Sequence, residues 1–414
     1  MLYSFLRILV GFTLRIFFRK IYIIGTVHVR AGKPQLIASN HPSGFLEPLI
    51  MACFFPKPLH FLVRGDVFDN PFLKPLLRGT NQIPVFRFRD GFSRLRENSQ
   101  SIDESLDVLK NNQNLLIFAE GNTQSIKKLR PLQKGISRIA FQSMENNSAS
   151  ELEILPVGIN FSQFLSFDEV VMLRIGPPVK VKEYMSEYNL DKNKGHQKIL
   201  DDVYHEMKKN VIHLDHQERI HVFEKLCLLQ NMEYIEGYTP FFSTTPDKLD
   251  RDICLAQKTD ALDSDKLTMV KDELHNFEQH LKSMGKSFKD LNKRPFNVLK
   301  VLILILGFIP AFLGLIFHVI PLTGGYLFMK KNVDQLEFKS SILMVSTLVL
   351  LMIFYIILFV VVILFDIPLF LMLAGFLCGL WLRFYYTEMK SFSLVSSNTY
   401  ENIRKKAASI LEKI

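Results

Sequence analysis

Between residues 35 and 182 the chain alternates short apolar runs with longer stretches of helical pattern. The runs are QLIAS, LHFLV, NQIPVFR, NLLIFAE, LEILPVGINF and VVMLRIG, and stretches such as 91–110 and 134–146 lie between them. Short apolar strands separated by helices are typical of a largely parallel sheet covered by helices on both faces. The pattern predicts the α/β fold class, with the chemistry in loops that follow the carboxyl ends of the strands.

Residues 183–295 have a different pattern, with many charged positions, helical spacing and few β-rich runs. Four histidines lie in this region: His205, His213, His216 and His221. Because no carboxylate pattern accompanies them, we expect a solvated helical surface rather than a metal site. Another helix is expected over residues 391–414.

Residues 296–390 contain long uncharged runs. No Lys, Arg, Asp or Glu occurs in residues 301–329 or in residues 340–365, and the second of these runs is long enough to cross a bilayer core. A turn at residues 366–368 leads into a third apolar run. We therefore expect a membrane hairpin over residues 340–385.

The distribution of basic residues predicts how these segments cross the membrane. Lys330, Lys339, Arg383 and Lys390 flank the hairpin, whereas Lys and Arg are missing from the ten positions on either side of Asp366. Positive residues near membrane ends stay on the cytoplasmic side. The preceding domain is then expected on the cytoplasmic face of the inner, or cytoplasmic, membrane. Residues 301–329 would be re-entrant and bent near Pro310, with a plain third span as the alternative.

The first 25 residues combine apolar positions with a basic stripe. Arg7, Gly11, Arg15 and Arg19 recur every four residues, so a helix would place them on one slowly drifting line. This pattern favours an amphipathic helix in the membrane interface over residues 1–25. A helix packed on its own domain is the alternative.

The formal charge of +9 is concentrated at the start of the chain. Residues 1–100 hold 14 Lys and Arg against 5 Asp and Glu. Such a balance suits an anionic bilayer surface or an anionic substrate. No nucleic-acid partner is expected, because no nucleic-acid-binding motif accompanies the charge. The four cysteines show neither metal-ligand nor disulfide-framework spacing, which predicts inert reduced thiols.

The stretch SNHPSGFLEP holds the first candidate chemistry. Asn40 and His41 follow an apolar run directly, Gly44 permits a tight loop, and Glu47 lies six residues after the histidine. A carboxylate that accepts a hydrogen bond from histidine Nδ1 leaves Nε2 free to take a proton from an alcohol. His41 and Glu47 are therefore a candidate general base and the acid that orients it.

Two further stretches place basic residues at strand ends. The run NLLIFAE ends at Glu120 and Gly121, a basic segment follows, and a helix is expected to open at Lys134. The run NQIPVFRFR ends with Arg87 and Arg89. Helix N-termini beside Lys and Arg side chains bind phosphate groups readily.

Taken in order, these blocks resemble the phospholipid/glycerol acyltransferase superfamily of the PlsC type. That family has Asn-His, a short spacer and Asp, then a block ending in Arg, then Phe-Pro-Glu-Gly, then a strand with Pro. The corresponding residues here are Asn40-His41 with Glu47, Ile83–Arg87, Phe118–Gly121 and Leu155–Val157. The chain departs from the pattern in a five-residue spacer, in Glu47 for Asp and in Ala119 for Pro.

The resemblance covers about residues 30–180 and implies an acyltransferase domain over residues 26–182. The later regions look similar to those of fungal glycerol-3-phosphate acyltransferases. The family's chemistry implies acyl-CoA or acyl-carrier protein as donor and glycerol 3-phosphate or 1-acylglycerol 3-phosphate as acceptor, with no metal or cofactor. The implied catalytic residues are His41 and Glu47, and the implied substrate-binding residues are Asn40, Gly44, Arg87, Glu120, Gly121 and Lys134.

Three other functions remain open at this point. One is acyl transfer to a lyso-aminolipid or another lysolipid. Another is a non-catalytic membrane scaffold that keeps a degraded acyltransferase site. A lipid transporter is the third, although ionisable groups, which usually line transport paths, are nearly missing from the apolar segments.

Overall fold

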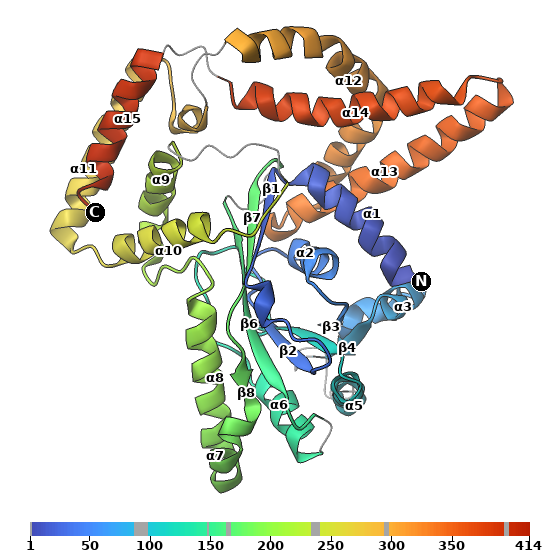
Figure 1. The fold of residues 1–414 in the computed structure, drawn as a ribbon, viewed down its shortest axis with the longest axis vertical. Helices are drawn as coiled ribbons and strands as arrows, with labels where there is room; N and C mark the ends of the chain where they lie inside the picture. Colours follow the sequence, from blue (N-terminus) through green and yellow to red (C-terminus); the bar gives the residue numbers. More distant parts are fainter. Residues whose placement is uncertain are drawn as a thin grey trace.

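The computed structural model describes residues 2–86, 98–146, 149–162, 167–232, 241–293, 298–392 and 397–414. These residues form one sheet of nine strands with helices on both faces (Figure 1). Three long apolar helices lie at one end of the molecule, at the top of the view.

The sheet runs mostly parallel. Its strands are β1 (Lys20–Ile24), β2 (Gln35–Ser39), β3 (Leu59–Arg64), β4 (Gln82–Val85), β5 (Asn114–Phe118), β6 (Glu153–Phe161), β7 (Val170–Ile175), β8 (Val179–Lys180) and β9 (Phe242–Ser243). Their order is β4-β3-β5-β2-β6-β7-β1-β9, and β8 pairs with β6. The antiparallel pairs join β6 to β7 and to β8, and the other pairs are parallel. The predicted α/β class with a largely parallel sheet is confirmed.

Each face of the sheet has its own apolar core, because successive strand side chains point to opposite sides. Along β2, Leu36 and Ala38 belong to one core and Ile37 to the other. The first core is covered by α5 (Asn98–Lys110), α6 (Gly135–Glu145) and α8 (Lys192–Lys208). The second is covered by α1 (Leu2–Phe17) and α2 (Leu46–Phe54).

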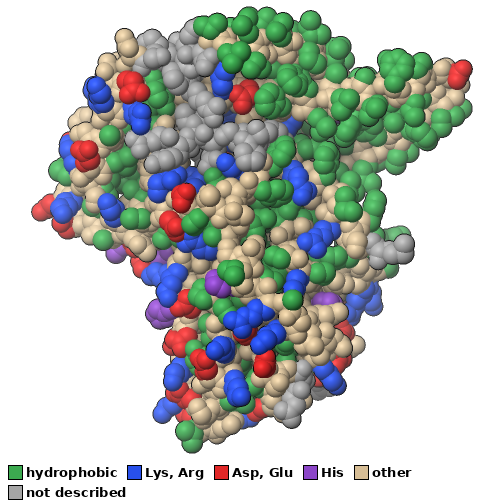
Figure 2. Space-filling model, in the orientation of Figure 1, with side chains coloured by type: hydrophobic (Ala, Val, Ile, Leu, Met, Phe, Trp, Pro, Cys, Tyr) green, Lys and Arg blue, Asp and Glu red, His purple; other side chains and the backbone are tan. Residues whose placement is uncertain are grey.

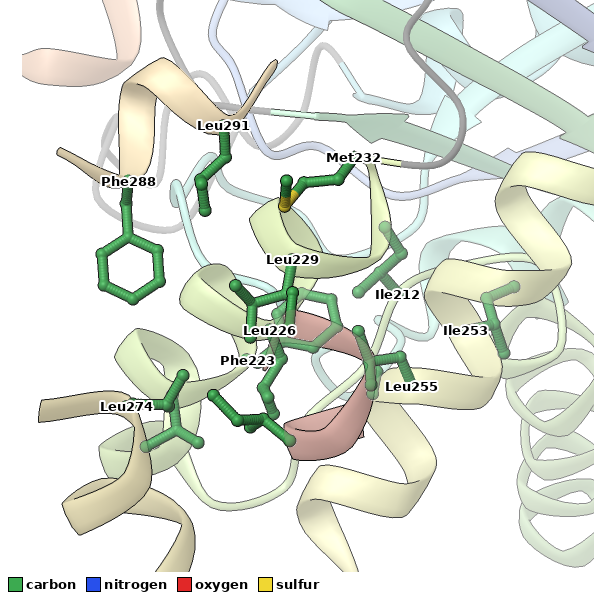
Figure 3. Packing of buried hydrophobic residues seen from close by; sticks show 14 of the residues in the cluster. Ile212, Phe223, Leu226, Leu229, Met232, Ile253, Leu255, Leu274, Phe288 and Leu291 are labelled. Atoms are coloured by element: carbon green, nitrogen blue, oxygen red, sulfur yellow. The ribbon is translucent and has the colours of Figure 1, made fainter. Parts of the chain in front are cut away.

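The charged region that follows the sheet builds a third core. It is formed by α9 (Ile220–Gln230), α10 (Asp247–Asp260), α11 (Ser264–Ser283) and the C-terminal α15 (Ser397–Leu411). Figure 3 shows side chains of α9, α10 and α11 meeting there. The region is continuous with the sheet, since α8 packs on one face and β9 pairs with β1. The short α7 (Met185–Leu190) lies at the far end of the molecule from the apolar helices (Figure 1).

The N-terminal helix differs from the expected one in length and in orientation. It ends at Phe17, and Lys20–Ile24 forms a strand of the sheet instead of continuing the helix. Its basic stripe faces the protein. Arg7 donates to the carbonyls of Cys53 and Phe55 at 3.2 and 2.8 Å, at the end of α2, where the helix dipole favours a cation.

The other face of α1 is apolar and open. Leu2, Phe5, Ile8 and Phe12 are exposed, with Ile8 the most exposed at 74%. Because protein groups bind the arginines, this face presents an almost purely apolar surface. The helix therefore packs on its own domain through the side that carries Arg7 and the buried Leu14 and Phe17, and it leaves the apolar side of Phe5 and Ile8 uncovered.

Among the described residues, three helices are long and apolar enough to cross a membrane: α12 (Val298–Asn332), α13 (Leu336–Leu364) and α14 (Leu369–Lys390). Packing of α12 is extensive against both neighbours, whereas α13 and α14 contact each other little. Gly314 lies so close to α14 that a methyl group there would meet the Cys378 carbonyl oxygen at 2.2 Å. Small residues permit this kind of close helix contact in membranes.

The first half of α12 lies along α14 and the second half along α13. Lys300 pairs with Glu388 at 2.7 Å near the end of α14, and His318 in the middle reaches the Tyr355 hydroxyl at 2.7 Å. Further on, Ser346 of α13 donates to the Gly325 carbonyl at 3.2 Å. Both ends of α12 thus lie beside the ends of α13 and α14 that join the rest of the protein, and Figure 1 shows the helix curving between them.

The helix, which we expect to bend near Pro310, is continuous through Pro310 and Pro321. A proline removes one backbone hydrogen bond and bends the helix. A full break would leave several backbone groups unpaired among apolar side chains, which costs far more. The helix α12 is therefore curved but not broken.

A buried carboxylate joins the sheet to the apolar helices. Asp168, 2% exposed, lies just before β7 and pairs with Arg19 at 2.5 Å and with Arg383 of α14 at 2.8 Å. Thr387, also on α14, donates to it at 2.9 Å. Burial alone would raise the pKa of Asp168, but the two arginines outweigh burial and hold that pKa below its ordinary value. These three charged side chains therefore connect the segment after α1, the sheet and α14.

We predict that Asp168→Asn lowers the free energy of unfolding by about 3–5 kcal/mol, because it leaves two arginines buried without their carboxylate. Asp366→Asn is the matched control. Both aspartates have positive φ angles, 67° and 51°, which asparagine also tolerates, but Asp366 is exposed. Thermal unfolding in detergent should show a clear loss for the first variant and almost none for the second. Equal midpoints would contradict the role given to Asp168.

Candidate active site

The candidate site lies where two neighbouring parallel strands end. Ser39 of β2 is paired with Phe118 of β5, so the residues that follow both strands emerge at one edge of the sheet. The Ala119 backbone N–H donates to the Ser39 carbonyl at 2.9 Å and extends this pairing by one residue. The loops that carry His41 and Glu120 are therefore side by side, as the sequence predicted for strand ends.

His41 and Glu47 face each other across the loop that leads into α2. His41 Nδ1 lies 3.5 Å from Glu47 Oε2, a distance that permits an ion pair but is long for a hydrogen bond. Within the described part of the chain, neither Nδ1 nor either Glu47 oxygen has a hydrogen-bond partner. Catalytic hydrogen bonds are often long in unliganded sites and shorten when substrate binds.

The two side chains differ sharply in exposure. The Glu47 side chain is fully buried, whereas the His41 side chain is 15% exposed. Burial raises the pKa of Glu47, and the His41 side chain opposes that rise. The partly exposed imidazole therefore lies between a buried carboxyl group and the protein surface.

The His41 ring is held by β5. It stacks on Phe118 with ring centroids 4.1 Å apart and planes 15° apart. Its backbone N–H donates to Glu120 Oε2 at 3.0 Å. The strand next to β2 therefore positions both the ring and the backbone of the histidine.

Glu120 binds protein groups with both carboxylate oxygens. Besides His41, it accepts from the Arg130 backbone N–H at 2.8 Å and from the Arg130 guanidinium at 2.8 Å. Glu120 is 6% exposed. In this structure it joins the His41 loop to the segment of Lys127, Lys128 and Arg130, which we call the basic loop. The expected substrate contact of Glu120 stays a prediction.

Asn40 likewise binds the protein. Its side-chain amide donates to the Ile159 carbonyl at 2.9 Å and accepts from the Ile159 N–H at 2.8 Å, which continues the pairing of β2 with β6. Gly121 has a φ of 76°, which glycine adopts without strain. Lys134 is exposed and precedes the first residue of α6. Arg87 lies outside the described residues.

Gly44 is covered by the apolar helices. A methyl group on Gly44 would lie 2.3 Å from the ring of Phe338, in the first turn of α13. The ring of Phe45 also contacts Phe338, with centroids 5.7 Å apart. The start of α13 therefore packs directly on the loop that carries the histidine.

Two side chains hold the basic loop in place, and no motif in the sequence predicted that role for either of them. His213 accepts from the Leu129 N–H at 3.0 Å and contacts Asp215 at 2.9 Å, so it is a buried loop residue and not part of a solvated helix. Lys127 is buried and donates to the Phe161 carbonyl at 3.2 Å. Burial lowers the pKa of both side chains. A small cavity beside the His41 loop is lined by Asn40, Pro42, Lys127 and Lys128, among others.

Among the described residues, no group of three or more His, Cys, Asp or Glu side chains is arranged to hold a metal ion. Residues 20–160 match the model of the family described as Acyltransferase. Over these residues the α/β part of this chain is similar to the acyltransferase family. The match spans the sheet from β1 almost to the end of β6, including the loops of His41 and Glu120.

Several solved structures are similar to part of this chain, and one example is a bacterial enzyme. The 1-acyl-sn-glycerophosphate (LPA) acyltransferase PlsC from Thermotoga maritima is similar over 46% of this chain and 72% of its own, with 20% identity and a TM-score of 0.33. No curated protein matches the chain.

We predict that Gly44→Ala destabilises the protein by about 1–3 kcal/mol, the range for overpacking a filled contact. Thermal unfolding should show this loss, and Phe338→Leu in the same chain should recover part of it by making room. Gly135→Ala is the control, because a methyl group there meets no atom within 4 Å. If Gly44→Ala and Gly135→Ala unfold alike, α13 does not pack on the loop as described.

Proposed function

We propose that the chain transfers a fatty acyl group from a thioester, acyl-CoA or acyl-carrier protein, to a hydroxyl of glycerol 3-phosphate or 1-acylglycerol 3-phosphate. The observation that carries the proposal is the histidine of an acyltransferase domain facing a fully buried carboxylate. The three apolar helices and the packing of α13 on the same loop support a lipid substrate.

In the proposed step His41 Nε2 takes the proton of the acceptor hydroxyl as its oxygen attacks the thioester carbonyl carbon. Glu47 stabilises the imidazolium through Nδ1. The new carbon–oxygen ester bond forms, the carbon–sulfur bond breaks, and the leaving thiolate recovers the proton from His41. A general base of this kind contributes about 10²–10⁴ in rate.

The acceptor phosphate would bind the basic groups beside this edge of the sheet. Arg87, the Glu120-Gly121 loop and Lys134 are the proposed contacts, with Asn40 and Gly44 shaping the histidine loop. Lys127 and Lys128 line the neighbouring cavity and add positive charge there. A lyso-aminolipid acceptor would need no such phosphate contact.

The test is an assay of the purified, reconstituted protein with labelled acyl-CoA and acyl-carrier protein. Acceptors should include glycerol 3-phosphate, 1-acylglycerol 3-phosphate and phosphate-free lysolipids. The proposal predicts product with a phosphorylated acceptor. Robust turnover of phosphate-free acceptors alone would favour the lyso-aminolipid function, and no turnover of any acceptor would favour a scaffold.

In that assay His41→Ala should lower kcat by about 10³, the scale of a lost general base. Glu47→Gln should also be severe, because an amide cannot stabilise the imidazolium, whereas Glu47→Asp should keep partial activity. Since burial disfavours the Glu47 charge, Glu47→Gln should leave the thermal midpoint unchanged or higher. A tenth of wild-type turnover in His41→Ala, or a large stability loss in Glu47→Gln, would contradict these roles.

We also propose that α12 is re-entrant, with the acyltransferase domain on the cytoplasmic side of the inner membrane. Both ends of α12 lie beside the same ends of α13 and α14, which supports entry and exit at one face. Single cysteines at Asn332 and Asp366 should then differ on intact cells: an impermeant thiol label should reach position 366 but not position 332. Labelling at 332 would overturn the proposal.

A further inference from the structure

An apolar patch outside the three long helices lies on α3 (Leu73–Gly79), between β3 and β4. Phe72, Leu73 and Leu76 are exposed, and Phe72 is 88% exposed. These three residues are spaced to share one side of the helix. We call them the α3 face. Large apolar side chains exposed this fully mark an interaction surface when they continue into a larger patch.

The α3 face continues into the apolar side of α1. A methyl group on Gly79, the last residue of α3, would lie 2.8 Å from Leu2 of α1. The exposed Phe5 and Ile8 follow along the same helix. Further along α1, Phe12 stacks on Phe376 of α14 with centroids 6.3 Å apart. One apolar surface thus runs from α3 along α1 to the membrane-length helices.

The arrangement of the elements agrees with this continuity. Figure 1 shows α1, α3 and the α13–α14 hairpin on the right of the view, and α7 at the bottom of the molecule. Figure 2 shows hydrophobic side chains gathered over the apolar helices and continuing toward the right-hand side. At the opposite end of the molecule, the same view shows charged side chains among the others.

Charge agrees with a lipid surface as well. Lys74 is exposed on α3 itself, next to the exposed side chains of Phe72, Leu73 and Leu76. An apolar face beside a lysine is a pattern of elements that lie in the headgroup region of an anionic bilayer.

We propose that α3, together with the outer side of α1, is a second membrane contact that lies in one leaflet without crossing it. The occupant of the α3 face is the acyl and headgroup region of an anionic bilayer. The contact holds the β3–β4 edge of the sheet against the membrane, in addition to the anchor that α12–α14 provide. It does not depend on the proposed acyl transfer.

The test uses the full-length chain with Cys254→Ser and Cys378→Ala, reconstituted in phosphatidylcholine–phosphatidylglycerol vesicles. Phe72→Cys or Leu76→Cys is labelled with an environment-sensitive fluorophore, and quenching is measured with spin-labelled lipid and with aqueous iodide. Leu190→Cys is the matched control, because Leu190 is 90% exposed and ends α7 at the far end of the molecule. Ile356→Cys, on the exposed side of α13, is the positive control.

Labels at positions 72 and 76 should be quenched at least about twofold more by shallow spin-labelled lipid than the label at position 190. Iodide should show the reverse order. Labels at 72 and 76 that iodide quenches as strongly as the label at 190 would overturn the proposal. Shielding from both quenchers would also overturn it, since a second copy of the chain would then cover the α3 face.

Discussion

The buried ion pair of Asp168 with Arg19 and Arg383 is the contact on which the arrangement of this protein depends. A carboxylate taken out of water is costly unless cations and hydrogen bonds surround it. Arg19 lies between α1 and β1, Arg383 and Thr387 lie on α14, and Asp168 precedes β7. Moving α14 away would separate Arg383 and Thr387 from the Asp168 carboxylate and leave Arg19 as its remaining arginine partner. The apolar helices and the sheet are therefore held as one unit.

A second contact places the start of α13 against the loop of the candidate active site. Phe338, in the first turn of α13, covers Gly44 in the loop that carries His41. The apolar helices thus contact the loop that follows β2 and the residue Asp168 that precedes β7. This contact joins the apolar helices to the loop of the proposed base.

The sequence predicted the sheet well, because its strands are short apolar runs bounded by helices. It also predicted that His41 and Glu47 face each other, since six residues of loop and helix start bring them together. Contacts between distant positions were not predictable. Asn40 and Glu120 carry polar groups that could bind a substrate. In the structure, Asn40 is hydrogen-bonded to the Ile159 backbone and Glu120 to Arg130, and these bonds hold the loops in place.

The arginine stripe of α1 shows the same limit. Spacing predicted one line of basic residues but not the direction in which it faces. Arg7 donates to carbonyls at the end of α2, and Arg19 pairs with Asp168, so both side chains face the protein. The apolar side of α1 therefore faces outward. Asp168 and Arg383 are separated by 215 positions, and neither lies in a motif. Such pairs depend on the assembled fold and leave no local pattern.

The proposed function requires His41 to activate an acceptor hydroxyl for direct attack on an acyl thioester. The most direct measurement is the rate of thiol release from a long-chain acyl thioester by the reconstituted wild-type protein. It is made with 1-acylglycerol 3-phosphate and with the same lipid lacking its free hydroxyl. Direct attack by the hydroxyl predicts rapid thiol release with the first lipid and only background release with the second. Equal release with both lipids would contradict direct attack.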